Sequence, residues 1–208
     1  MARRKAVMSV DWPSLKAKLR KPKPKSERIA REILVTKVTA AHEVLMEDFE
    51  AHEVTEEIKG GVGASNTSKT LSGYGDLFSF IGFESGSDPI GKVRDYLLGS
   101  IRINKRAHAK TKNGGYVFRA RGPDMKELES MTPLPYDPSR SWIRGIERGI
   151  SGLGYYLQSA RKKLNNSRSG GGIQIKSGKL RSGGFRPVSY MSGLINQFYT
   201  RISKKFRA

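Results

Sequence analysis

Residues 63–70 are the part of the sequence that comes closest to a known chemical motif. They read GASNTSKT, which matches the phosphate-binding pattern GxxxxGK[ST] except that Ser68 replaces the second glycine. That glycine lets backbone amides curl around a phosphate, and the next residues, LSGYG, are a poor start for the helix that should follow. No later apolar strand ends in a magnesium-binding aspartate. We therefore expect neither nucleotide binding nor any other cofactor.

The histidines give no sign of a metal or catalytic site. His42, His52 and His108 lack the HExxH or paired spacing that places two ligands on one face. His52 and Glu56 could chelate a metal weakly, but a surface position is the simpler expectation. The absence of cysteine excludes disulfides, thiolate metal sites and cysteine nucleophiles. Because no acidic residue follows Glu147 and no Gly-x-Ser-x-Gly motif occurs, the sequence predicts a protein that is not an enzyme.

Charge is segregated along the 208 residues. The chain has 39 basic and 19 acidic residues, a net charge of +20. Residues 1–26 carry +8, residues 27–100 carry −6 and residues 101–208 carry +18. Such a chain repels itself unless a polyanion or an acidic protein surface lies nearby, and the acidic section of a neighbouring copy could be that surface. No apolar run approaches the roughly 20 residues that span a bilayer, so we expect a soluble intracellular protein without membrane contact.

A basic β-hairpin is the best candidate for contact with nucleic acid. Residues 102–110 and 116–121, joined across an Asn-Gly-Gly turn, fit two antiparallel strands. Tyr116 and Phe118 could stack on bases, but they alternate as a core face would, so only the charges are expected to be available. The candidate nucleic-acid contacts, which would be electrostatic and nonspecific, are Arg102, Lys105, Arg106, Lys110 and Lys112.

Long amphipathic helices are expected to form the framework. The first would begin after an N-cap at Ser26, and a second after Asp137 with Pro138 as its first residue. A short helix is expected over 89–101, with Leu98 among its inward residues, and a final one from about Ser189. The expected inward residues of the first, second and final helices are Ala30, Leu34, Val38, Ala41, Leu45 and Phe49; Trp142, Ile146, Ile150, Leu153 and Leu157; and Met191, Ile195, Phe198, Ile202 and Phe206. Four acidic residues late in the first helix, Glu43, Glu47, Asp48 and Glu50, should need basic partners, because the helix dipole disfavours anions there.

Strands and loops are expected to separate these helices. Apolar residues predict a short strand at 54–58 and another at 77–83. Glycine-rich polar residues predict loops at 60–76 and 165–186. The second loop is expected to take the form of a mobile hairpin or arm. We expect these loops, like residues 1–26, to depend on neighbouring subunits for their order.

Two short segments resemble proteins of tailed bacteriophages. Residues 65–68 and 71–83, SNTS and LSGYGDLFSFIGF, resemble small virion proteins of the neck or tail-completion kind, and residues 177–182, SGKLRS, resemble the TGxLRxS element of the HK97 gp10-like family of tail-completion proteins. The resemblance implies an α+β subunit that forms a ring between portal and tail and grips its neighbours with arms and loops. It implies no catalytic residues, because the family is structural.

The sequence as a whole predicts an assembly protein. We expect an α+β fold in which two or three long amphipathic helices pack on a small antiparallel sheet, with a basic extended arm at 1–26 and an α+β domain at 27–208. The expected function is that of a structural virion protein of the phage head–tail junction, a homo-oligomeric ring beside portal, adaptor or tail-tube proteins, assembled in the host cytoplasm. The alternative is a basic RNA-binding protein of ribosomal type. The expected partner contacts are Lys16, Lys18, Arg20, Lys21, Lys23, Lys25, Tyr74, Lys179, Arg181 and Arg186.

Overall fold

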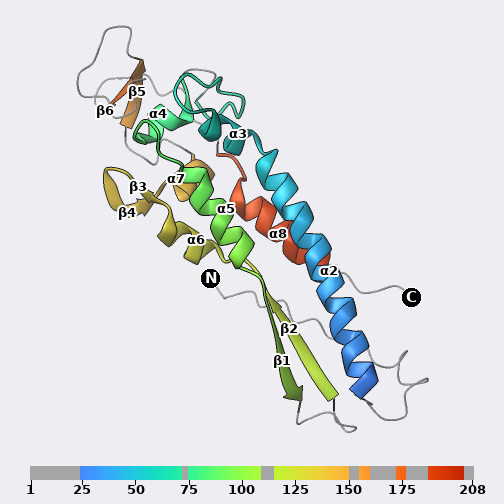
Figure 1. Ribbon diagram of the computed structural model, residues 1–208. Coiled ribbons are helices and arrows are strands. Elements are labelled where there is room, and N and C mark those ends of the chain that lie inside the picture. The colour runs from blue at the N-terminus through green and yellow to red at the C-terminus, as the bar shows by residue number, and fades with distance from the viewer. Residues whose placement is uncertain are drawn as a thin grey trace.

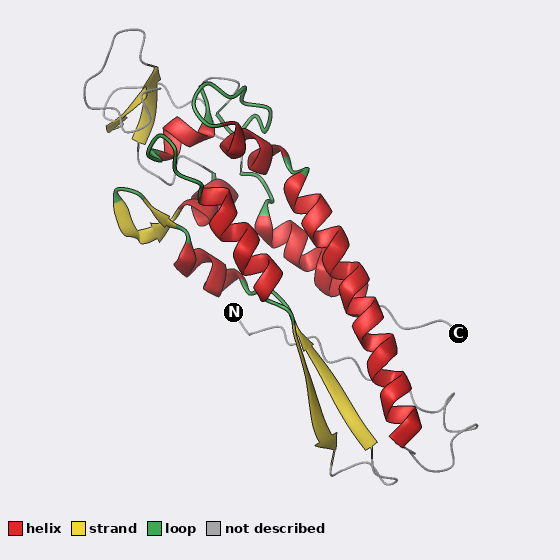
Figure 2. Cartoon of the chain, in the orientation of Figure 1, coloured by secondary structure: helices red, strands yellow, loops and turns green. Residues whose placement is uncertain are grey.

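The computed structural model describes residues 24–71, 75–108, 115–149, 155–159, 172–176 and 187–203. Helices dominate these residues, and the strands form three separate two-stranded antiparallel sheets (Figure 2). The expected α+β class is therefore confirmed. Figure 1 shows a body of helices from which one hairpin and the start of the longest helix project together.

The longest helix is α2, Pro24–Glu50. Its inward stripe is confirmed, since Leu34, Val38, Ala41, Leu45 and Phe49 are all buried. The helix begins at Pro24, two residues before the expected cap at Ser26. Proline suits a first helical turn because its missing N–H would have no partner there.

The C-terminal helix α8, Met191–Ser203, packs along α2 (Figure 1). Its expected inward residues from Met191 to Ile202 are buried, and Phe206 lies outside the described residues. Gly122 fits against this helix because it has no side chain, since a Cβ atom there would clash with the Phe198 ring. The two helices and the segment at Gly122 thus form one packed unit.

Residues 54–58 form a helix, so the expected strand there is wrong. They belong to α3, Glu53–Gly60, which begins where the His52 side chain accepts a hydrogen bond from the Val54 N–H at 3.2 Å. His52 is half-buried against Tyr190, with ring centroids 4.8 Å apart, so the surface position expected for it is also wrong. Burial lowers the pKa of His52. The buried residues Val54 and Ile58 are four apart, which suits one face of a helix as well as a strand.

Residues 77–83 were also expected to be a strand, and this prediction is wrong as well. Leu77–Ile81 form a short helix, α4, with all five residues buried. Asp76 caps it by accepting a hydrogen bond from the Ser79 N–H at 2.6 Å, and Gly82 ends it with a φ of 84°. A short apolar run that is buried on all sides has no period that would tell a helix from a strand.

Helix α5, Pro89–Gly99, confirms the short helix expected from residue 89. Asp88 caps it by accepting a hydrogen bond from the Gly91 N–H at 2.7 Å. Ile90, Val93 and Leu97 are buried as expected, but Leu98 is 55% exposed, so its predicted inward position is wrong. Consecutive helical residues point about 100° apart, and Leu97 faces the core on one side of α5, which leaves Leu98 toward solvent.

The second long helix is not present. The residues after Asp137 form β4, Asp137–Ser141, which pairs with β3, Pro133–Leu134. Helix α7, Trp142–Arg148, begins only after Ser141 and stops where Gly149 adopts a φ of 86°. Trp142 and Ile146 are buried as expected.

Further elements replace the rest of that helix or connect the sheets. Leu157, an expected inward residue of the second helix, lies in strand β5, Tyr155–Ser159, and Ile150 and Leu153 lie outside the described residues. Strand β5 pairs with β6, Gly172–Lys176. Of these two strands, only β6 lies within the segment 165–186 that was expected to be a loop. Helix α6, Met125–Met131, precedes β3.

Candidate interaction surface of the basic hairpin

The expected basic hairpin is confirmed. Strand β1, Arg102–His108, pairs in antiparallel register with β2, Gly115–Arg121, and Figure 1 shows this hairpin extending away from the helical body beside the first turns of α2. Strand side chains alternate between the two faces, so the hairpin has one face toward α2 and one away from it. The two faces carry different chemistry.

The inner face carries the buried apolar residues of the hairpin. Phe118 and Ala120 are buried, and Ile103, the cross-strand partner of Ala120, is half-buried against the core. Lys105 is paired in the register with Phe118, and its ammonium forms an ion pair with Glu27 of α2. The structure thus places Lys105 as a link between hairpin and helix, on the opposite face from Arg102.

The outer face is rich in arginine. Arg102 lies directly across from Arg121, and Asn104 lies across from Arg119. Arg121 forms an ion pair with Glu127 of α6, whereas Arg102 and Arg119 have no acidic partner among the residues that the structure describes. Like charges directly opposite each other on two strands repel, so this face has a surplus of positive charge that an anion would relieve.

Arg119 adds a second sign of incomplete pairing. Its Nε is buried and makes no hydrogen bond within the described part of the chain. Sequence reasoning missed Arg119 and Arg121, although the alternation of Phe118 and Ala120 with these two arginines contained the signal. Arg106 continues the outer register opposite Val117, as far as the backbone alone can place it.

Most of the other residues expected to bind partners lie outside the described ranges, and for Lys25 only the backbone is described, in the first turn of α2. The residues outside those ranges are Lys16, Lys18, Arg20, Lys21, Lys23, Tyr74, Lys110, Lys112, Lys179, Arg181 and Arg186.

Two of the four acidic residues late in α2, Asp48 and Glu50, have basic partners as expected, whereas Glu43 and Glu47 have none among the described residues. Glu50 accepts two hydrogen bonds from Arg94, at 2.5 and 3.1 Å, and one from Lys59 at 3.2 Å. Asp48 lies 4.0 Å from the Arg201 guanidinium. The Arg94 pairing lowers the pKa of Glu50.

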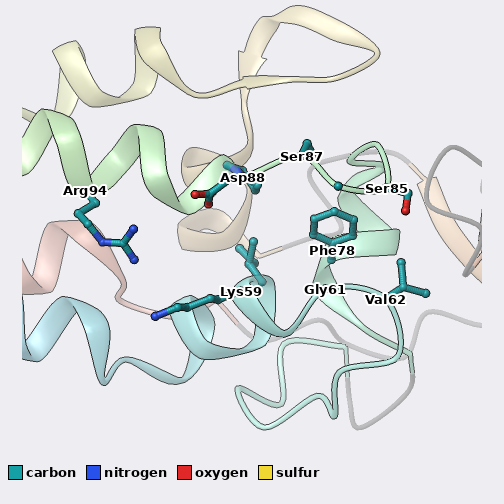
Figure 3. A pocket seen from close by; sticks show the side chains of 11 residues that line it. Lys59, Gly61, Val62, Phe78, Ser85, Ser87, Asp88 and Arg94 are labelled. Atoms are coloured by element: carbon teal, nitrogen blue, oxygen red, sulfur yellow. The ribbon is translucent and has the colours of Figure 1, made fainter.

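A cavity of about 420 Å³ between α3 and α5 is shown in Figure 3. Its cationic side chains are Lys59 and Arg94, and Asp88 also lines it. Because both cations already bind Glu50, the cavity does not present free positive charge to a ligand. It is therefore a weaker candidate for anion binding than the hairpin.

The motif-like segment 63–70 is occupied with structural contacts. It follows α3 rather than a strand, and the next helix begins only at Leu77, so the strand–loop–helix context of a phosphate loop is absent here. Glu57, only 2% exposed, accepts hydrogen bonds from Asn66 and Ser68 of this loop, both at 2.7 Å. Contrary to expectation, the described part of the loop therefore has an anchor within its own chain.

Comparison with family models, with characterised proteins and with solved structures finds no match to this chain. Within the described ranges, no helix is long and apolar enough to cross a membrane, and no three histidine or acidic side chains gather as a metal site would require. The interaction surfaces of the molecule are therefore the guide to its function.

Proposed function

We propose that this chain is a structural virion protein of the head–tail junction of a tailed bacteriophage, in a neck, tail-completion or tail-terminator ring. The observation that supports this best is the projecting lobe made by the start of α2 and the hairpin β1–β2 (Figure 1). Its outer faces carry the exposed isoleucines Ile29 and Ile33, and two arginines, Arg102 and Arg119, that have no acidic partner within the described part of the chain. A projecting element with uncovered faces is suited to reach a neighbouring subunit.

The charge distribution favours the same role. The outer face of the hairpin is positive, whereas residues 27–100, which form most of the helical body, carry a net charge of −6. Contact between the hairpin of one subunit and the acidic body of another copy, or an acidic portal, adaptor or tail-tube protein, would compensate both. The same face could touch packaged DNA without reading its sequence.

Electron microscopy tests this proposal. The purified full chain, or virions that contain it, should show a ring or a defined layer at the neck. A monodisperse monomer that is absent from virions would refute the junction role.

An RNA-binding protein of ribosomal type is the second candidate, and the outer arginines favour it specifically. Each phosphate contact that is lost should lower the slope of log affinity against log salt by about 1. We therefore expect Arg102→Ala and Arg119→Ala each to lower both the RNA affinity and this slope. Arg121→Ala is the matched control, because Glu127 already neutralises Arg121.

Filter binding of RNA over a range of salt concentrations distinguishes the two candidates. A steep dependence of RNA affinity on salt concentration would favour the RNA-binding function if it becomes weaker in Arg102→Ala and Arg119→Ala but not in Arg121→Ala. A flat slope in the unmodified protein would exclude that function and leave the junction proposal standing.

A further inference from the structure

The outward side of α2 carries a second apolar stripe. Ile29, Ile33, Thr36 and Ala40 recur at spacings of 4, 3 and 4, and all four are exposed, Ile29 to 44% and Ile33 to 43%. At about 100° per residue, they lie on the side of the helix opposite the buried core stripe. Alternating spacings of 4 and 3 are typical of the seam between two helices in a coiled coil. The stripe therefore fits a partner helix.

The sizes of the side chains indicate how the partner helix would lie. The large residues Ile29 and Ile33 come first, and the small residues Thr36 and Ala40 come last. In an antiparallel pair of two copies, Ile29 would face Ala40 and Ile33 would face Thr36, so each large residue would fill the space beside a small one. A parallel pair would place the two alanines opposite each other and leave a gap. The shape of the stripe thus favours an antiparallel second copy.

Charge favours the same partner. The stripe continues at the same spacing to Glu43 and Glu47, which are exposed and have no basic partner among the described residues, in contrast to Asp48 and Glu50. Glu47 lies in the last turn of α2, where the helix dipole disfavours anions. In the antiparallel pair Glu43 and Glu47 would lie beside the start of the partner's helix, where the dipole is positive.

We propose that two copies of this chain pair through the outward stripe of α2, antiparallel, with a two-fold axis between Ile33 and Thr36. This inference rests on the proposed function, in which copies of the chain assemble with one another. It identifies one of the contacts through which they would do so. A two-fold contact closes on itself, so a ring also needs a second, heterologous contact. The outer face of the hairpin is available for that contact.

Cross-linking between cysteines tests the geometry, because the natural chain has none. The full-length variants Ile29→Cys and Ala40→Cys are oxidised separately and as a mixture. In the antiparallel pair only the mixture brings the two cysteines together. Two copies of Cys at position 29 would be about 16 Å apart along the helices, since 11 residues separate the facing positions. A disulfide needs Cα atoms closer than about 7 Å.

The expected result is a disulfide-linked dimer from the mixture and little from either variant alone. Leu98→Cys, at a residue of α5 that is 55% exposed, is the control for random collision. Cross-linking of Ile29→Cys alone as strong as that of the mixture would refute the antiparallel arrangement. Cross-linking of the mixture no stronger than that of the control would refute the contact itself.

Light scattering coupled to gel filtration separates this inference from the proposed function. Ile33→Glu should weaken the dimer at least about tenfold, because it places a charge in the seam, whereas Leu98→Glu should not. Unchanged circular dichroism checks that Ile33→Glu still folds, as the exposure of Ile33 leads us to expect. If this variant assembles as the natural chain does, the pairing is wrong and assembly uses other surfaces. If the natural chain is monomeric, both proposals fail.

Discussion

Replacing Glu57 with alanine should release the loop 61–71 from the body of the protein. The buried carboxylate accepts three hydrogen bonds, from Asn66 Nδ2 and Ser68 Oγ at 2.7 Å and from the Leu77 N–H at 3.0 Å. The first two come from the loop and the third from the start of α4, so Glu57 joins three segments. Thr70, fully buried, completes the cluster with a 2.9 Å bond to Ser68.

The expected loss of stability is large. A hydrogen bond to a charged group contributes about 1.5–3 kcal/mol, and a buried donor left without a partner costs about 1–3 kcal/mol. These values do not add in full, because the opened loop lets water reach some donors. We expect Glu57→Ala to lower the free energy of unfolding by about 3–5 kcal/mol, a large fraction of the roughly 5–15 kcal/mol of a typical domain.

Two matched variants sharpen this prediction. Glu57→Gln keeps the shape, and its amide can donate to Ser68 while its oxygen still accepts from Asn66 and Leu77, so it should cost only about 1 kcal/mol. Glu56→Ala removes a neighbouring exposed carboxylate and should change stability by less than about 0.5 kcal/mol.

Urea unfolding measures the free energies, and limited trypsin digestion with mass spectrometry measures cleavage after the exposed Lys69 in the loop. Cleavage should rise in Glu57→Ala and stay low in Glu56→Ala. If Glu57→Ala unfolds at the same urea concentration as Glu56→Ala, with equal cleavage, the buried carboxylate does not anchor the loop.

Two further changes test the packing and electrostatics of the body. Gly122→Ala should destabilise the protein by about 1–3 kcal/mol, seen as a lower melting temperature, because its Cβ would clash with the buried Phe198 ring; an unchanged melting temperature would contradict the tight contact. Burial raises the pKa of Glu147, which accepts a hydrogen bond from the Ser192 N–H at 2.6 Å. The folded state therefore holds this proton more tightly than the unfolded state, and this carboxyl's contribution to stability should fall as the pH rises through the raised pKa. Glu147→Gln should remove that dependence in urea unfolding at several pH values, and an unchanged pH profile would contradict it.

The sequence was sufficient to predict the elements whose hydrophobic period is long and regular. The buried faces of α2 and α8 followed from repeats of three and four residues over several turns, which no other structure satisfies. The hairpin β1–β2 followed from two alternating runs around an Asn-Gly-Gly turn. The need for basic partners near Glu50 followed from the helix dipole, although the sequence could not say which residues would supply them.

Tertiary structure decided what depends on contacts between distant residues. Residues 54–58 and 77–81 became helices because their surroundings bury them, and a short apolar run has too few residues to show its own period. The expected helix after Asp137 was replaced by a strand and a short helix, because pairing with β3 and the positive φ of Gly149 outweighed an apparently helical pattern. In the hairpin, the sequence identified the basic residues, but only the register separated the inner Lys105, which pairs with α2, from the outer arginines. Charge is a property of the residues, whereas the face on which it lies depends on the packing of the whole chain.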